Sequence, residues 1–268
     1  MTDEHIEIAG RMWGSAAADY DDISFSVGDA LLHTAMRLNP LPSDNVVDIA
    51  TGTGMSARYA ARFAASVTGI DIADGLLDAA REISAHIDPS ITFIKADAAN
   101  LPFPEAHFDR AVSTFGIMFA PNQEGAAAKL ARVVKLGGRA VITSWAPDPA
   151  VGRVFELLSE YQEAGPEGGP SPMAWGEKDG VASLLGESFD LSFESGVSYG
   201  YFDSTEDLWR FYARTFGPIR EIIESNDDSI VRELGRRFKE EHEQFGGGLG
   251  LTIPRPYLLA KAVRRSSD

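Results

Sequence analysis

The sequence predicts an α/β protein built on a doubly wound, mostly parallel β-sheet. Two observations predict this class. Short apolar runs alternate with helical segments between residues 45 and 145, and three of these runs end at or beside an aspartate. Strands and helices that alternate at this spacing form a parallel sheet with helices on both faces. The 268 residues suffice for one such domain and a sizeable elaboration.

The elements of the predicted sheet follow one another from the N-terminal side. Residues 1–43 place apolar side chains among polar ones, which predicts one or two helices that stop at Asn39-Pro40. After them, apolar runs predict strands, and the longer segments between the runs predict helices. We therefore expect strands at 46–50, 67–70, 91–94, 108–114 and 138–145, and helices at about 55–65, 74–86 and 121–136.

The pattern changes after Trp145. A helix is expected at 151–164, a loop rich in Gly and Pro at 165–172, and a loosely alternating strand at 189–202. Ser204 with an acid three residues later has the form of a helix N-terminus, and Gly217-Pro218 is expected to end that helix. A helix at 229–245 and a last strand at 255–263 complete the chain.

Composition excludes several classes of protein. The formal net charge of −16 comes without a basic run, which argues against a nucleic-acid partner. No cysteine is present, so disulfides, thiolate metal sites and a cysteine nucleophile are excluded, and the five histidines lack ligand spacing, so no metal is expected. The acidic N-terminus is no signal peptide and no apolar run could span a bilayer, which predicts a cytoplasmic protein without a membrane partner.

A small-residue turn between the first strand and the first helix organises the predicted site. Gly52 and Gly54 would let a ligand approach the backbone, and the unpaired N–H groups of the helix N-terminus favour electron-rich groups. Asp48, Asp71 and Asp97 each end a strand or follow one closely, so they share the carboxyl edge of a parallel sheet.

These three acids suit an adenosyl cofactor. Asp71 follows Gly54 by 17 residues, about the spacing at which an acid accepts hydrogen bonds from ribose hydroxyls. Asp97, one strand further on, could accept from an adenine amino group. Asp48 could orient the turn or face a cationic amine through water.

Five segments resemble, in order, the class I S-adenosylmethionine-dependent methyltransferases of the small-molecule type. The first, Val47-Asp48-Ile49-Ala50-Thr51-Gly52-Thr53-Gly54, is similar to that family's acid and glycine motif, and the others are 69–72, 96–103, 108–119 and 132–139. The resemblance covers roughly 45–145. Two departures are Ala50, where the family usually has its first Gly, and Leu136, where it usually has Pro.

The resemblance implies S-adenosyl-L-methionine as cofactor and a seven-stranded sheet whose last strand runs antiparallel. It implies helices at 1–43 that cover the site, a cofactor-binding core at 44–146, a return helix, loop and strand at 147–202, a helical cap at 203–255, and a last strand and tail at 256–268. The cofactor-binding residues that it implies are Tyr20, Asp48, Ala50, Thr51, Gly52, Gly54, Asp71, Ile72, Asp97, Ala98 and Phe115.

The function expected is in-line methyl transfer to a small-molecule acceptor. Aromatic residues around 199–216 favour a partly apolar acceptor, with oxygen slightly preferred over nitrogen or carbon. One alternative is an NAD(P)-dependent oxidoreductase, because Gly52-x-Gly54-x-x-Ala57 satisfies the looser dinucleotide pattern. Tyr257-x-x-x-Lys261 mimics a dehydrogenase pair, but it falls in the last predicted strand. Another alternative is a non-catalytic cofactor-binding protein. A homodimer is compatible with the sequence.

The sequence assigns no catalytic residue. His33 and His107 lie near site segments, but without a partner acid at fixed spacing each is expected to be structural or exposed. The helical stripe of Trp209, Tyr212 and Phe216 is expected to form the core of the cap rather than a substrate pocket. Trp145 ends the fifth strand and either lines the site or packs under the cap.

Overall fold

A computed structural model describes residues 3–161 and 171–266 of the chain. The strands are β1 (Asn45–Ile49), β2 (Ser66–Asp71), β3 (Thr92–Lys95), β4 (Phe108–Thr114), β5 (Val134–Trp145), β6 (Phe189–Phe202), β7 (Gly246–Gly247) and β8 (Gly250–Arg264). The helices are α1 (Asp3–Gly14), α2 (Tyr20–Ser26), α3 (Gly28–Leu38), α4 (Met55–Ala61), α5 (Asp74–Ile83), α6 (Gln123–Val133), α7 (Pro149–Ser159), α8 (Lys178–Leu185), α9 (Thr205–Thr215), α10 (Gly217–Ser225) and α11 (Asp228–His242).

The strands form one sheet in the order β3-β2-β1-β4-β5-β8-β6, with β7 paired to β8. β1 to β5 run parallel to their neighbours, whereas β8 runs antiparallel to both β5 and β6. The predicted fold class is confirmed. The expected count of seven strands is one short, because the chain forms the two-residue strand β7 just before it enters β8.

Helices cover both faces of the sheet, and each interface is apolar. On one face, Val47, Ile49 and Phe108 pack against α6 and α8 through Leu130 and Leu185. On the other face, the strands pack against α3, α4 and α5, with buried members that include Leu38, Ala57, Val67, Leu77 and Val141. β1 is therefore apolar on both sides, as a central parallel strand must be.

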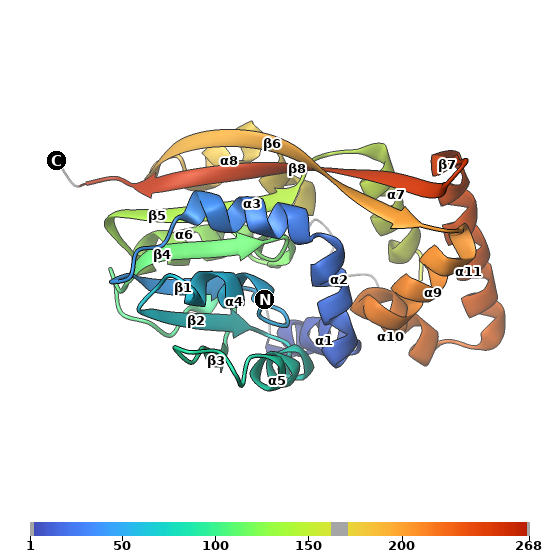
Figure 1. Cartoon of the computed structure of the whole chain (residues 1–268), viewed down its shortest axis with the longest axis horizontal. Helices are drawn as coiled ribbons and strands as arrows, with labels where there is room; N and C mark the ends of the chain where they lie inside the picture. Colours follow the sequence, from blue (N-terminus) through green and yellow to red (C-terminus); the bar gives the residue numbers. More distant parts are fainter. Residues whose placement is uncertain (1–2, 162–170, 267–268) are drawn as a thin grey trace.

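A third apolar cluster joins the cap, which consists of α9, α10 and α11, to α7. Its buried members include Leu157, Leu208, Ile219, Leu234 and Phe238. Figure 1 shows the cap at one end of the sheet, beyond the ends toward which the arrows of β2 and β4 point, with α1 and α2 beside it. The carboxyl edge of the parallel strands thus lies between these N-terminal helices and the cap.

Several elements differ from the expectation. α9 begins with the predicted cap, since Ser204 Oγ accepts the N–H of Asp207 at 3.1 Å. Gly217-Pro218, however, opens a further helix, α10, because Pro is well suited to the first turn of a helix. β5 begins at Val134 rather than 138, through a bulge opposite β4. α8 was not predicted, and β8 starts at Gly250, inside the segment expected to belong to the cap.

Residues 165–170 of the expected Gly- and Pro-rich loop lie outside the described residues. Among the helices of 3–161 and 171–266, none combines the length and apolarity needed to cross a bilayer.

Candidate functional site

A cavity opens at the carboxyl edge of β1, β2 and β4, under α1, α2 and the cap. Ten of the eleven residues named from the sequence line it: Tyr20, Asp48, Ala50, Thr51, Gly52, Asp71, Ile72, Asp97, Ala98 and Phe115. Gly54 belongs to the same turn but does not line the cavity. It packs against the Phe93 ring, which would lie 2.8 Å from a Cβ at this position.

The turn between β1 and α4 has an unusual backbone. Ala50, Gly52 and Gly54 have φ angles of +55°, +57° and +86°, in the left-handed region that glycine occupies most readily. The N–H of Gly52 donates to Asp71 Oδ2 at 2.9 Å, and the N–H of Thr51 donates to the Ile70 carbonyl at 2.8 Å. These bonds attach the turn to the end of β2.

The carboxyl edge of the parallel strands, with Asp48, Asp71 and Asp97, is here called the rim. Asp71 lies between the other two acids and is held in one orientation. It is 7% exposed, and its Oδ1 accepts the N–H of Ala73 at 3.0 Å while Oδ2 accepts from Gly52. Burial raises the pKa of Asp71, and these backbone hydrogen bonds oppose the rise. A fixed carboxylate with further lone pairs can accept hydrogen bonds from a pair of hydroxyl groups.

Asp48 lies beneath the turn. Its Oδ2 accepts the Thr51 hydroxyl at 2.6 Å, so it fixes the turn from below. The residue is 1% exposed, and burial raises the pKa of Asp48 to about 7, against the lowering effect of the Thr51 bond. The carboxyl group can therefore gain or lose a proton near neutral pH.

The third acid lies at the next loop of the rim. Asp97 Oδ1 accepts the N–H of Ala99 at 3.0 Å and so caps the short 3-10 helix Ala98–Asn100. The cavity wall next to it is apolar, formed by Ile72, Leu76, Ala98 and Ile117. A flat heteroaromatic base could lie against this wall and donate an amino hydrogen to Asp97.

The N-terminal helices cover the turn. A ring carbon of Tyr20 lies 3.5 Å from the point where a Cβ of Gly52 would be, so the phenol rests on the bare backbone of the turn. Burial raises the pKa of Tyr20, which keeps the phenol neutral. Trp13 meets Tyr20 edge-on, with ring centroids 6.4 Å apart, and contacts Phe216 of the cap region at 5.7 Å.

The part of the cavity under the cap, here called the aromatic end, is lined by rings. Its lining residues include Trp13, Phe119, Trp145, Phe155, Phe202, Tyr212 and Phe216. Trp145 therefore lines the site, and its ring stacks on Phe115 at 3.7 Å. The stripe 209–216 belongs to the apolar cluster of the cap, as predicted, and Trp209 and Tyr212 both pack on Phe238. Tyr212 and Phe216 also line the cavity, which the sequence did not indicate.

Three buried polar residues of the lining were missed from the sequence, Ser56, His242 and Arg255. The signal for His242 was present, because it continues by one turn the helical face that carries Leu234 and Phe238. Arg255 of β8 donates to the Ser26 carbonyl at 2.6 Å and to Ser198 Oγ at 3.2 Å. His33 bonds Tyr257 and Glu194 instead, and His107 is exposed.

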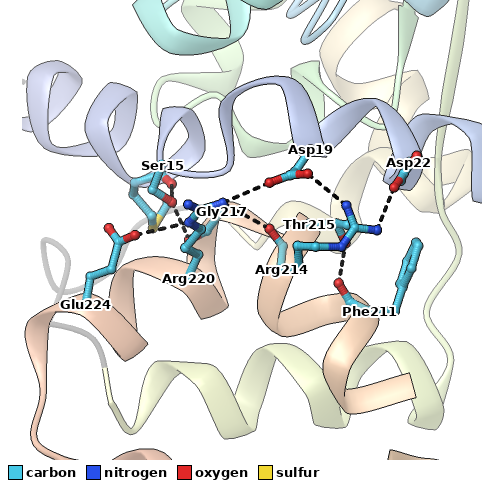
Figure 2. A network of polar contacts seen from close by, with 10 residues as sticks. Ser15, Asp19, Asp22, Phe211, Arg214, Thr215, Gly217, Arg220 and Glu224 are labelled. Carbon is cyan, nitrogen blue, oxygen red and sulfur yellow. Dashed lines mark hydrogen bonds and ion pairs between the residues drawn. The ribbon is translucent and has the colours of Figure 1, made fainter. Parts of the chain in front are cut away.

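Ion pairs connect the N-terminal helices to the cap (Figure 2). Arg214 of α9 donates to Asp19 Oδ1 at 2.8 Å and to Asp22 Oδ2 at 2.6 Å. Arg220 of α10 reaches the other oxygen of Asp19 at 3.2 Å, and Ser15 Oγ donates to the Gly217 carbonyl at 2.9 Å. The N-terminal helices and the cap, here called the two covers of the site, are therefore bound to each other.

The site fits the adenosyl cofactor that the sequence suggested. Asp71 and Asp97 present oriented carboxylates, apolar side chains line the cavity beside them, and Gly52 lines it without a side chain of its own. In the described residues, no group of three or more His, Asp or Glu side chains is arranged to hold a metal ion.

Comparison with known proteins gives a consistent result. A family model described as a methyltransferase domain matches residues 47–142. An uncharacterised protein of Mycobacterium tuberculosis is 30% identical over 241 residues, which cover 85% of this chain and 87% of the relative. A demethylmenaquinone methyltransferase of Clavibacter sepedonicus is 33% identical over 148 residues, 53% of this chain and 60% of the enzyme.

Among solved structures, the fold is similar to phosphoethanolamine N-methyltransferase 2 of Haemonchus contortus in complex with S-adenosyl-L-methionine. The TM-score is 0.56 at 18% identity, and the match covers 89% of this chain and 53% of that chain.

Proposed function

The chain belongs to the class I S-adenosylmethionine-dependent methyltransferases, and on this premise we propose that it methylates an oxygen atom of a small, largely aromatic acceptor. The observation that carries the proposal is the aromatic end of the cavity, which continues directly from the carboxylate rim. Flat, apolar walls favour a flat, apolar ligand, because ring stacking adds to the gain from burying apolar surface.

The placement of charge favours oxygen over nitrogen. An amine acceptor is cationic at neutral pH and requires facing carboxylates. Asp48 and Asp71 lie at the carboxyl ends of β1 and β2, and Asp97 follows β3, so these acids belong to the sheet edge rather than to the rings of the aromatic end. A phenolic hydroxyl is neutral and enters an apolar cavity at much lower cost than a charge. The name of the Clavibacter sepedonicus relative likewise denotes a small-molecule acceptor.

When bound, S-adenosyl-L-methionine supplies a methyl group that its sulfonium makes electrophilic. The chain's own residues bind and orient. Asp71 would accept the ribose hydroxyls, Asp97 the adenine amino group, and Tyr20 would cover the turn at Gly52. The closed covers would exclude water and hold the acceptor in line, and positioning of this kind lowers a barrier by up to about 7–11 kcal/mol.

The proposal is tested with tritiated S-adenosyl-L-methionine and a size-matched set of acceptors: phenols, carboxylic acids, primary amines and electron-rich ring carbons. We expect label in the phenol products, identified by mass spectrometry. Isothermal titration with S-adenosyl-L-methionine runs in parallel. Cofactor binding with label found only in amines, only on carbon or in none of the set would overturn the proposed acceptor class.

A further inference from the structure

One histidine of the cap lines the cavity. His242, the last residue of α11, lines the cavity and is 6% exposed. Its ring packs on that of Phe238, with centroids 4.5 Å apart, and lies 6.1 Å from that of Phe245. The imidazole is therefore held in place inside an apolar surrounding.

The hydrogen bond of this ring identifies its tautomer. His242 Nδ1 lies 2.7 Å from the Phe238 carbonyl oxygen. A carbonyl oxygen only accepts hydrogen bonds, so Nδ1 carries a hydrogen and donates it. In the neutral ring, Nε2 then carries a lone pair and is the atom that can receive a proton.

The surroundings favour the neutral ring. Burial lowers the pKa of His242 below the usual imidazole range. Two charged groups act on it from the elements packed around it, Glu241 of α11, which opposes this shift, and Arg153 of α7, which adds to it. These two groups pair with each other, with Arg153 Nε 3.4 Å from Glu241 Oε2, so their effects largely offset.

We propose that His242 is the general base that takes the proton from the acceptor hydroxyl, an inference that rests on the proposed function. The hydroxyl proton passes to Nε2 while an oxygen lone pair forms the bond to the methyl carbon. The carbon–sulfur bond breaks and its electron pair stays on sulfur, which becomes a neutral thioether. The imidazolium loses its proton to solvent when the product leaves. General bases of this kind contribute a factor of roughly 10²–10⁴ in rate.

The test uses a variant that keeps the packing bond. In His242→Asn the amide Nδ2 can still donate to the Phe238 carbonyl, but no base remains. The matched control is His107→Asn, at an exposed histidine outside the cavity. Two probe acceptors are compared between pH 6 and 9: 4-methylphenol, which is protonated through most of this range, and 4-nitrophenol, which is largely ionised at its upper end.

We expect His242→Asn to lower kcat for 4-methylphenol about a hundredfold or more. At pH 8–9 the variant should change kcat for 4-nitrophenol less than threefold, because that acceptor has already lost its proton. The rise of the wild-type rate with pH should disappear in His242→Asn, whereas His107→Asn should behave as the wild type. The affinity for S-adenosyl-L-methionine should stay within twofold in both variants.

Equal losses with the two phenols would assign His242 a packing role, and no loss would assign it no role; either result overturns the inference while the proposed function stands. A wild-type enzyme that binds S-adenosyl-L-methionine but methylates neither phenol overturns it as well. Label found only in amines, only on carbon or in none of the acceptor set is the separate failure of the proposed function.

Discussion

Replacing Asp48 by asparagine should change how the stability of the free protein depends on pH. The carboxyl group is buried, and its pKa is raised from 3.8 to about 7 in the folded chain. Between these two values the folded protein retains a proton that the unfolded chain has released. Each rise in pH through this window therefore favours unfolding, and the wild type loses stability from about pH 4 to pH 7.

The size of the effect follows from the same two values. A shift of about 3 pKa units corresponds to about 4 kcal/mol when fully expressed above pH 7, at 1.36 kcal/mol per unit. Between pH 5 and pH 8, the linkage relation gives a loss of roughly 2–3 kcal/mol from this one group. The asparagine side chain of the variant does not titrate, so this loss of stability between pH 5 and pH 8 should be absent from the variant.

The assay is urea unfolding of both proteins at pH 5 and pH 8, without cofactor. The difference in unfolding free energy, variant minus wild type, should rise by roughly 2–3 kcal/mol from the lower to the higher pH. The amide also faces the N–H of Ala57, which donates to the wild-type carboxylate. That mismatch changes the unfolding free energy of the variant by the same amount at pH 5 and at pH 8, so it cancels from the comparison.

Asp78→Asn is the matched control. Asp78 is 76% exposed and pairs with Arg81 on the surface, so its replacement should leave the pH profile nearly unchanged. The same variant-minus-wild-type difference at pH 5 and pH 8 for Asp48→Asn would refute the reasoning, because it would mean that Asp48 is ionised in the folded protein at both.

Three further predictions concern the rim and the covers. Asp71→Asn should weaken S-adenosyl-L-methionine binding by about 10- to 100-fold in calorimetry, the value of charged hydrogen bonds to two hydroxyls, and an unchanged affinity would contradict this role. Gly116→Ala should destabilise the chain by about 1–3 kcal/mol in thermal unfolding, because the new Cβ would lie 2.6 Å from the Cβ of Ala50; adding Ala50→Gly should restore part of the loss, and no rescue would argue against this contact. Arg214→Gln removes two ion pairs between the covers, so the unfolding free energy should change by less than about 1 kcal/mol. S-adenosylhomocysteine should dissociate severalfold faster in stopped-flow measurements. An unchanged dissociation rate would mean that these pairs do not hold the site closed.

The rim could be predicted because its signals are local. The strand before Asp48, the glycine turn and the acid after the second strand lie within about thirty residues, and strand-end position follows from the parallel topology. Elements in the second half were predicted less well. Gly217-Pro218 can end one helix or open the next, and only the packing of Ile219 and Ile222 into the cap core favours α10.

The aromatic end could not be predicted, because its residues come from segments far apart in the chain. Trp13, Phe155 and His242 share no sequence period, and each is individually consistent with an ordinary core position. The prediction for the stripe 209–216 was incomplete for this reason, since Tyr212 and Phe216 belong to the cap cluster and also line the cavity. Periodicity shows that one side of α9 is buried, but not whether the buried side faces the cap core or a cavity.

By itself, then, the sequence determined the alternation of strands and helices, the glycine turn and the three acids at one edge, since each depends on backbone preferences and spacings of a few residues. Tertiary structure alone decided which side chains meet under the cap, which nitrogen of His242 carries the hydrogen, and how far burial raises the pKa of Asp48. These properties depend on desolvation and on contacts between distant segments, which exist only once the helices have closed over the sheet.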